Sequence, residues 1–220
     1  QGIKFDDGAA IDAIIQPARL ASNQGIIIYL GANSFVNISG GTDRYSDSSA
    51  SSGIEIRPDN GQIRFLTGGS GADPTSKMAI NSNGTVGIGE DSPDGNLHIK
   101  SSTSDEPVVI IENTNNDATG GTLKFEKSTT DEANGDVIGT INFTGRNSAN
   151  NANQIANIIT KVVDTTNGSV DGSMLFQIIG NGSFTNNLYL ESGKVGIGTT
   201  SPSQALDVTG NITVDGGGIT

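Results

Sequence analysis

The sequence contains no cysteine and no tryptophan, and only one histidine and three tyrosines in 220 residues. Without cysteine, disulfides and thiolate metal sites are excluded. Aromatic residues make up 5% of the chain, so large side chains that anchor a core or stack on a sugar are scarce. No hydrophobic run approaches the roughly 20 residues that a membrane-spanning helix needs.

Positive charge is also scarce. Twelve Lys and Arg residues face 24 Asp and Glu residues, which gives a net charge of −12. An acidic field of this size repels nucleic acid and anionic bilayers, and no cluster of Lys and Arg offsets it locally. We therefore expect no binding to nucleic acid and no membrane insertion, and the acidity fits a soluble protein on the exterior of a particle.

Residues that carry catalysis are almost absent. His98 lies in a short strand pattern opposite Leu97 and Ile99, where a surface role is expected. One histidine cannot form a two-histidine metal site within one chain, although three copies of His98 about an axis could meet at an ion. Gly196-Ile197-Gly198 lacks the third glycine of a dinucleotide site. Acidic pairs such as Asp131 and Glu132 lie in turn-like sequence. We expect no enzyme activity, no cofactor and no metal site.

The residues that are abundant favour strands and turns. Isoleucine greatly outnumbers leucine, valine and threonine are common, and Asn-Gly occurs five times. Patches 107–112, 121–127, 137–144, 154–163, 173–179, 205–208 and 211–214 are among the predicted strands. Only residues 9–22 suggest a helix, and Pro17 limits it to a short helix or a turn. The predicted fold class is all-β.

One motif occurs twice. Val86-Gly-Ile-Gly-Glu-Asp-Ser-Pro93 is repeated as Val195-Gly-Ile-Gly-Thr-Thr-Ser-Pro202. The match extends to apolar residues on both sides, and further upstream Phe65 aligns with Phe176. A motif that recurs with its flanks indicates a structural unit.

The repeated Gly-Ile-Gly-x-x-Ser-Pro motif, followed by Leu-x-Val-x-Gly-Asn-Ile in its second copy, resembles the shaft segments of bacteriophage tail fibres. Many such fibres carry a C-terminal intramolecular chaperone of the endosialidase type. The block 108–190 is similar to another segment of these fibres, so the resemblance covers about the C-terminal two thirds of the chain. It implies a trimeric, β-rich fibre that helps a virion to reach or hold its host.

The resemblance and the strand pattern together predict an elongated, intertwined homotrimeric fibre. Four parts are expected. They are an N-terminal segment (1–52), a first slim shaft repeat (53–104), a thicker β-meander module of sandwich or prism form (105–190), and a second shaft repeat with a C-terminal linker (191–220). Sharing a core between copies suits a chain with so few large apolar side chains.

The motif residues have predicted architectural roles. Glycine has no Cβ, so glycines let backbones approach closely at a three-fold axis, the isoleucines fill its centre, and the prolines turn the chain outward. The residues are Gly87, Ile88, Gly89, Pro93, Gly196, Ile197, Gly198 and Pro202. A competing interpretation makes them hairpin bends in a monomeric sheet. Tyr45, in a polar loop, is the candidate for ligand contact.

The predicted function is that of a structural subunit of a viral tail fibre, located in the virion and used in host attachment. Its expected partners are its own copies, other tail proteins and a host glycan or protein receptor. Two alternatives remain open. One is a receptor-binding or glycan-depolymerising spike, and the other is a bacterial extracellular filament protein built from similar modules.

Overall fold

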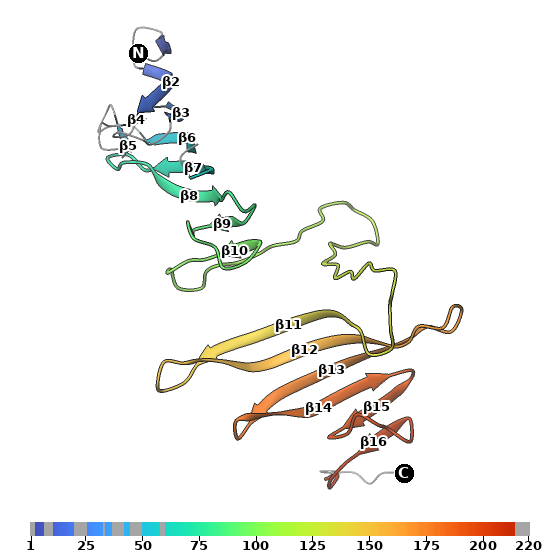
Figure 1. Ribbon diagram of the computed structural model, residues 1–220. Helices are drawn as coiled ribbons and strands as arrows, with labels where there is room; N and C mark the ends of the chain where they lie inside the picture. The colour runs from blue at the N-terminus through green and yellow to red at the C-terminus, as the bar shows by residue number, and fades with distance from the viewer. Residues whose placement is uncertain are drawn as a thin grey trace. The chain divides into compact units, whose positions relative to one another are not determined.

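The computed structural model describes residues 3–6, 11–19, 26–32, 34–36, 42–44, 50–57 and 60–213 (Figure 1). Over these residues the chain forms strands, turns and loops and no helix, which confirms the all-β prediction. The chain divides into two compact units, residues 1–110 and 111–220.

The first unit holds an eight-stranded sheet in the order β1-β2-β3-β6-β7-β8-β9-β10. Neighbouring strands are antiparallel except for the parallel pair β9 and β10. The strands are β1 (Ile3–Asp6), β2 (Ile11–Arg19), β3 (Ile26–Ala32), β6 (Ser51–Arg57), β7 (Gln62–Gly68), β8 (Thr75–Ile80), β9 (Val86–Ile88) and β10 (Leu97–Ile99). Strands β4 (Ser34–Val36) and β5 (Thr42–Arg44) pair with each other separately.

The helix or turn predicted at residues 9–22 is wrong, because residues 11–19 form strand β2. Pro17 has no N–H to donate and is tolerated where one side of a strand is unpaired. Among the described residues, the β1 ladder ends with Ile3 opposite Ile15, and Pro17 lies opposite Ile28 of β3. The β-branched isoleucines of β2 then favour an extended backbone.

The second unit is a six-stranded sheet in chain order, β11 to β16, again antiparallel except for its last pair. Its strands are β11 (Val137–Arg146), β12 (Ala152–Asp164), β13 (Asp171–Gly180), β14 (Ser183–Glu191), β15 (Lys194–Ile197) and β16 (Leu206–Val208). Within one chain this unit is a single layer, so a sandwich or prism would need a second layer against it.

The Asn-Gly pairs confirm the turn predictions made from them. All five glycines have a positive φ, between 66° and 94°. Residues 60–61, 83–84, 167–168 and 181–182 each lie in the connection between two antiparallel strands. Glycine adopts this backbone region without the steric cost that other residues incur, so the dipeptide marks the chain reversals.

Three predicted strands are not formed among the described residues. Residues 107–112, 121–127 and 211–213 belong to no sheet there, and Val214 lies outside the described part. The patterns are strand-like, but a strand requires a neighbouring strand that supplies hydrogen bonds.

The sequence repeat is also a repeat in the fold. In unit 1, Phe65 pairs with Met78, Met78 with Ile88, and Ile88 with Ile99. In unit 2, Phe176, Leu188, Ile197 and Val208 pair in the same succession. Even the irregularity recurs, because the register shifts directly after Phe65 and directly after Phe176. The alignment of the two phenylalanines is therefore confirmed.

Very few residues of the ranges 50–57 and 60–213 form a core. Apart from two prolines, Leu66 and Ala79 are the only buried hydrophobic residues in these ranges, whereas many isoleucine, valine, leucine and phenylalanine side chains are exposed. A sheet with one uncovered apolar face normally packs against another layer. Strands β7 to β10 of the first unit and strands β13 to β16 of the second both have such a face.

Candidate functional site

The first glycine of each motif accommodates a loop of its own chain. Gly87 in β9 and Gly196 in β15 are both buried. A Cβ on Gly87 would overlap the carbonyl oxygen of Glu90, and one on Gly196 would overlap that of Thr199. These glycines are thus required within one chain by the loop that follows the motif, and their role at a shared axis stays a prediction.

The second glycine of each motif starts that loop. Gly89 and Gly198 have the same φ of 73°, a left-handed backbone that favours glycine. Their N–H groups donate to the carbonyl oxygens of Lys77 (2.9 Å) and Asn187 (3.4 Å). Lys77 and Asn187 are the residues skipped by the register shift after each phenylalanine. The β-bulge at this register shift and the second motif glycine are therefore joined by a hydrogen bond, and the same arrangement occurs in both units.

The loop after the first motif covers one face of its sheet. Glu90 pairs with Lys100, and Asp91 pairs with Arg64 of β7. Arg64 also lies 3.7 Å from the carboxylate of Glu55, which is 1% exposed and is paired with Arg57 at 2.8 Å. This face is therefore polar and is covered by the chain itself.

A second pair of matching residues closes the loops. His98 in β10 and Asp207 in β16 occupy the same register position, opposite Gly87 and Gly196 respectively. The Nδ1 atom of His98 accepts the backbone N–H of Asp94 at 3.3 Å. The carboxylate of Asp207 accepts the backbone N–H and the hydroxyl of Ser203, both at 2.9 Å. His98 is thus half-buried and structural, a role that the sequence analysis missed.

We expect the Asp207 contact to make stability depend on pH. The hydrogen bonds from Ser203 hold the pKa of this carboxyl below its ordinary value of 3.8. Because the folded pKa is lowered, the stabilisation is complete above pH 3.8 and is lost as the pH falls through the folded pKa. Asp207→Asn should lower the melting temperature at pH 7, and the difference from the parent chain should shrink below pH 3.8.

The matched control is Asp207→His, which gives the second loop the acceptor that the first loop uses. This variant should melt closer to the parent chain at pH 7 than Asp207→Asn does. Scanning calorimetry at pH 7 and pH 3 checks both statements, and an Asn variant that melts like the parent chain at pH 7 would refute them.

The opposite face of each repeat is apolar and uncovered. Paired residues share a face of a sheet, as do residues two apart along a strand. The resulting array is the same in both units, and we call it the repeat face. In unit 1 it comprises Ile63, Phe65, Met78, Ile80, Val86, Ile88, Leu97 and Ile99, and in unit 2 Met174, Phe176, Leu188, Leu190, Val195, Ile197, Leu206 and Val208.

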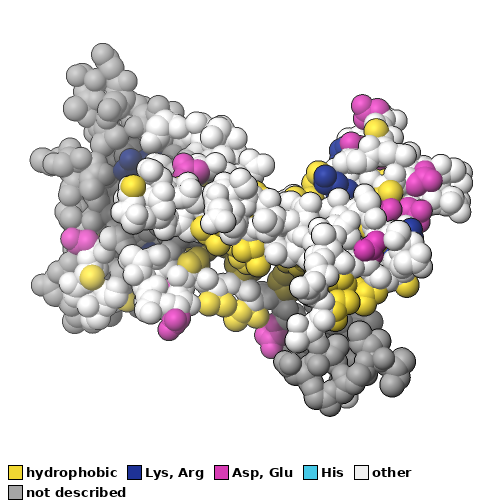
Figure 2. Space-filling view, turned by 90° about the horizontal axis from the view of Figure 1, so that it is seen from below, with side chains coloured by type: hydrophobic (Ala, Val, Ile, Leu, Met, Phe, Trp, Pro, Cys, Tyr) yellow, Lys and Arg dark blue, Asp and Glu magenta, His cyan; other side chains and the backbone are white. Residues whose placement is uncertain are grey.

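None of these sixteen side chains is buried. The exposed fractions even match between the units, at 42% for Ile88 and 43% for Ile197, and at 61% for Leu97 and 58% for Leu206. Figure 2 shows hydrophobic side chains gathered in patches on the face in view instead of scattered singly. Extended apolar patches of this kind mark surfaces that bind another molecule.

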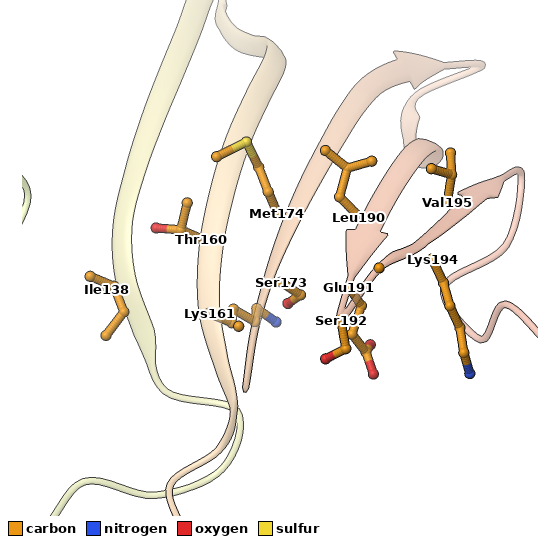
Figure 3. Close-up of a pocket in the computed structure, with 12 residues that line it drawn as sticks. Ile138, Thr160, Lys161, Ser173, Met174, Leu190, Glu191, Ser192, Lys194 and Val195 are labelled. Carbon is orange, nitrogen blue, oxygen red and sulfur yellow. The ribbon is translucent and has the colours of Figure 1, made fainter. Parts of the chain in front are cut away.

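The repeat face of unit 2 continues into a shallow hollow of about 690 Å³. Figure 3 shows Met174, Leu190 and Val195 projecting to one side of the sheet, with Glu191 and Lys194 projecting away from them. The row continues with Thr160 on β12. The hollow therefore has an apolar floor with charged groups at its rim, and it lacks a nucleophile paired with a base.

Other residues named from the sequence lie apart from the repeat face or outside the described part. Pro202 is buried and Pro93 is half-buried. Tyr45, the candidate ligand contact, lies outside the described residues. Asp131 and Glu132 are exposed in a loop. No group of three His, Cys, Asp or Glu residues close enough to hold a metal ion occurs in the ranges that the structure describes.

Comparison with known proteins adds no relative. No family model matches the chain, and no curated protein matches it. Among the described residues there is also no helix long and apolar enough to cross a membrane. The two uncovered repeat faces, with the motif loops on their opposite sides, are therefore the candidate functional surfaces of the described chain.

Proposed function

We propose that this chain is a structural subunit of a viral tail fibre and assembles as a homotrimer into a stiff β-structured rod used in host attachment. One observation carries the proposal. Both copies of the repeat present the same eight-residue apolar face, uncovered by their own chain. The resemblance of the Gly-Ile-Gly-x-x-Ser-Pro motifs to tail-fibre shafts supplies the trimer and the virion location.

The exposed surface supports assembly on physical grounds. Seven side chains of the two repeat faces are each more than a third exposed: Ile63, Phe65, Ile88, Leu97, Met174, Ile197 and Leu206. Removing apolar surface from water contributes roughly 25 cal/mol per Å². The chain is therefore stabilised when its apolar faces meet those of other copies.

The proposed mechanism is mechanical. In unit 1 the motif loop covers the polar face of the repeat, and in unit 2 it lies over Gly196 on the corresponding face. The repeat faces are left to meet the neighbouring copies. Three repeat faces turned toward one axis form a shared core and leave the acidic residues outside. A rod built this way holds a receptor-binding end away from the particle. At its base the rod contacts other tail proteins.

A receptor-binding or glycan-cleaving spike is the second candidate, favoured by the hollow with Glu191 and Lys194 at its rim. Incubation with host-surface polysaccharide separates it from a passive rod. Shortened polysaccharide chains would favour the spike, and unchanged chain lengths would favour the rod.

The first test of the proposal is the oligomeric state. Native mass spectrometry of the purified chain should show a species at three times 22.5 kDa, and an unboiled sample on an SDS gel should keep that size. Negative-stain images should show rods. A well-folded monomer at micromolar concentration would refute the proposal, because the repeat faces would then be stable in contact with water.

A further inference from the structure

The strand-like residues 107–112 and 121–127 are the two arms of a segment that pairs with no strand in the described part of the chain. Their backbone N–H and C=O groups form no backbone–backbone hydrogen bond with any described residue. They carry the apolar side chains Val108, Val109, Ile110, Ile111, Leu123 and Phe125, which are between 46% and 77% exposed. An apolar β-type sequence with an unpaired backbone is a template for pairing with another chain.

The two arms are nevertheless held in place. The turn between them is closed by Asn113, whose side-chain amide donates to the carbonyl oxygen of Thr119 at 3.1 Å. Beyond this turn the adjoining ends of the two arms meet, because a Cβ on Gly121 would lie 2.9 Å from Cγ2 of Ile111. The chain therefore reverses direction here without forming a ladder of hydrogen bonds.

The second arm lies beside the free edge of the sheet in unit 2. The ring of Phe125 contacts Gly139 of β11, where a Cβ would come 2.7 Å from that of Phe125. Lys127 pairs with Asp136, directly before β11. Strand β11 ends the sheet and pairs with β12 alone. The second arm thus lies next to a strand whose outer side is itself open.

We infer that residues 107–112 and 121–127 become β-strands when copies of the chain assemble, each arm pairing with an arm or a β11 edge of a neighbouring copy. This inference rests on the proposed function, because it needs an oligomer. Pairing of strands between chains supplies the missing ladder, and neighbouring side chains then cover the six apolar residues.

Two observations favour a second copy of this chain as the partner. Every copy carries the same unpaired arms, so a closed ring of copies satisfies all of them and leaves no free edge. The arms also differ in charge. Residues 107–112 carry one acidic residue, Glu112, whereas residues 121–127 carry two lysines and one glutamate. Lys124 is paired with Glu126 and Lys127 with Asp136 in the single chain. The first arm of one copy is therefore opposite in net charge to the second arm of the next.

The experiment is amide hydrogen exchange, followed by mass spectrometry, on the purified assembled chain. Amides of residues 107–112 and 121–127 should exchange at least about 100-fold more slowly than those of the polar loop 128–132. Native mass spectrometry of the same sample reports the oligomeric state. An intact oligomer with fast exchange in both arms would overturn this inference alone. A monomer would overturn it together with the proposed function.

A pair of proline substitutions separates pairing between copies from a role within one chain. Val109 and Thr129 are both exposed and have no backbone–backbone hydrogen bond in the described chain. Val109→Pro should lower the assembled fraction at least tenfold, because proline removes a donor from the new ladder. Thr129→Pro should leave assembly unchanged. Equal assembly of the two variants would overturn the inference.

A photo-crosslinking amino acid at position 109 then identifies the partner. In a mixture of isotopically labelled and unlabelled chains, the cross-links should join labelled to unlabelled chains. Cross-links found only within single chains would show that the arms pair in their own copy and would overturn the inference.

Discussion

Ile197→Asp should abolish assembly. Ile197 is 43% exposed in one chain, so an aspartate there costs a lone subunit little. In the proposed trimer three carboxylates would meet in an apolar core, and each buried, unpaired charge costs several kcal/mol. Size-exclusion chromatography with light scattering should show the trimer peak replaced by monomer or aggregate.

The matched control is Thr200→Asp, three residues further along the chain. Thr200 is exposed in the motif loop, and the corresponding residue of the first repeat is Asp91. This variant adds the same charge on the covered side of the repeat and should assemble like the parent chain. If both variants remain trimeric with unchanged melting temperatures, Ile197 does not lie in an interface.

Gly87→Ala should strongly destabilise unit 1. The added Cβ would overlap the carbonyl oxygen of Glu90, which is a backbone atom and cannot rotate away. The loop of residues 89–96 would have to move, together with the ion pair of Asp91 with Arg64. We expect a loss of about 3 kcal/mol or more in the free energy of unfolding, at the upper end of the cost of overpacking.

Gly69→Ala provides the control, because a Cβ at this position meets nothing within 4 Å and its φ is not positive. This change should be neutral, or stabilising by a few tenths of a kcal/mol through the unfolded state. Denaturant unfolding of both variants gives the two free energies. Equal values would mean that the motif loop adapts freely and that the glycine is not required by it.

The turns and the central strands could be predicted from local sequence because their signals are local. Asn-Gly needs only its own backbone preference, and the glycine of every such pair adopts the expected positive φ. Strands β11, β12 and β13 contain the predicted patches 137–144, 154–163 and 173–179 and extend beyond them, because each has a hairpin neighbour close in sequence.

Residues 107–112 mark the limit of strand prediction from local sequence. Their β-branched run indicates a strand, but periodicity says nothing about where the pairing partner lies. Pro17 shows the same limit in the other direction. Its effect depends on whether the neighbouring strand reaches it, which is a property of the sheet and not of residues 9–22.

The motif residues of the repeat were predicted because they are identical in its two copies. The residues that close the motif loops were missed because they differ between the copies. The motif glycines and isoleucines were found because they recur unchanged. His98 and Asp207 do the same work with different side chains, and a comparison by identity passes over them. The signal that could have found them is position, because each lies five residues after the proline of its motif and carries an acceptor.

The loop that follows each Gly-Ile-Gly motif also bears on how such a protein changes length during evolution. Each repeat forms its bulge, turn and loop contacts within its own residues, in the same register in both units. A repeat duplicated in tandem would therefore form the same loop contacts within its own residues, and it would present the same eight apolar positions. Duplication of one coding segment would lengthen the protein by a fixed increment without the need to invent a new interface, so recombination can adjust its reach in steps of a repeat.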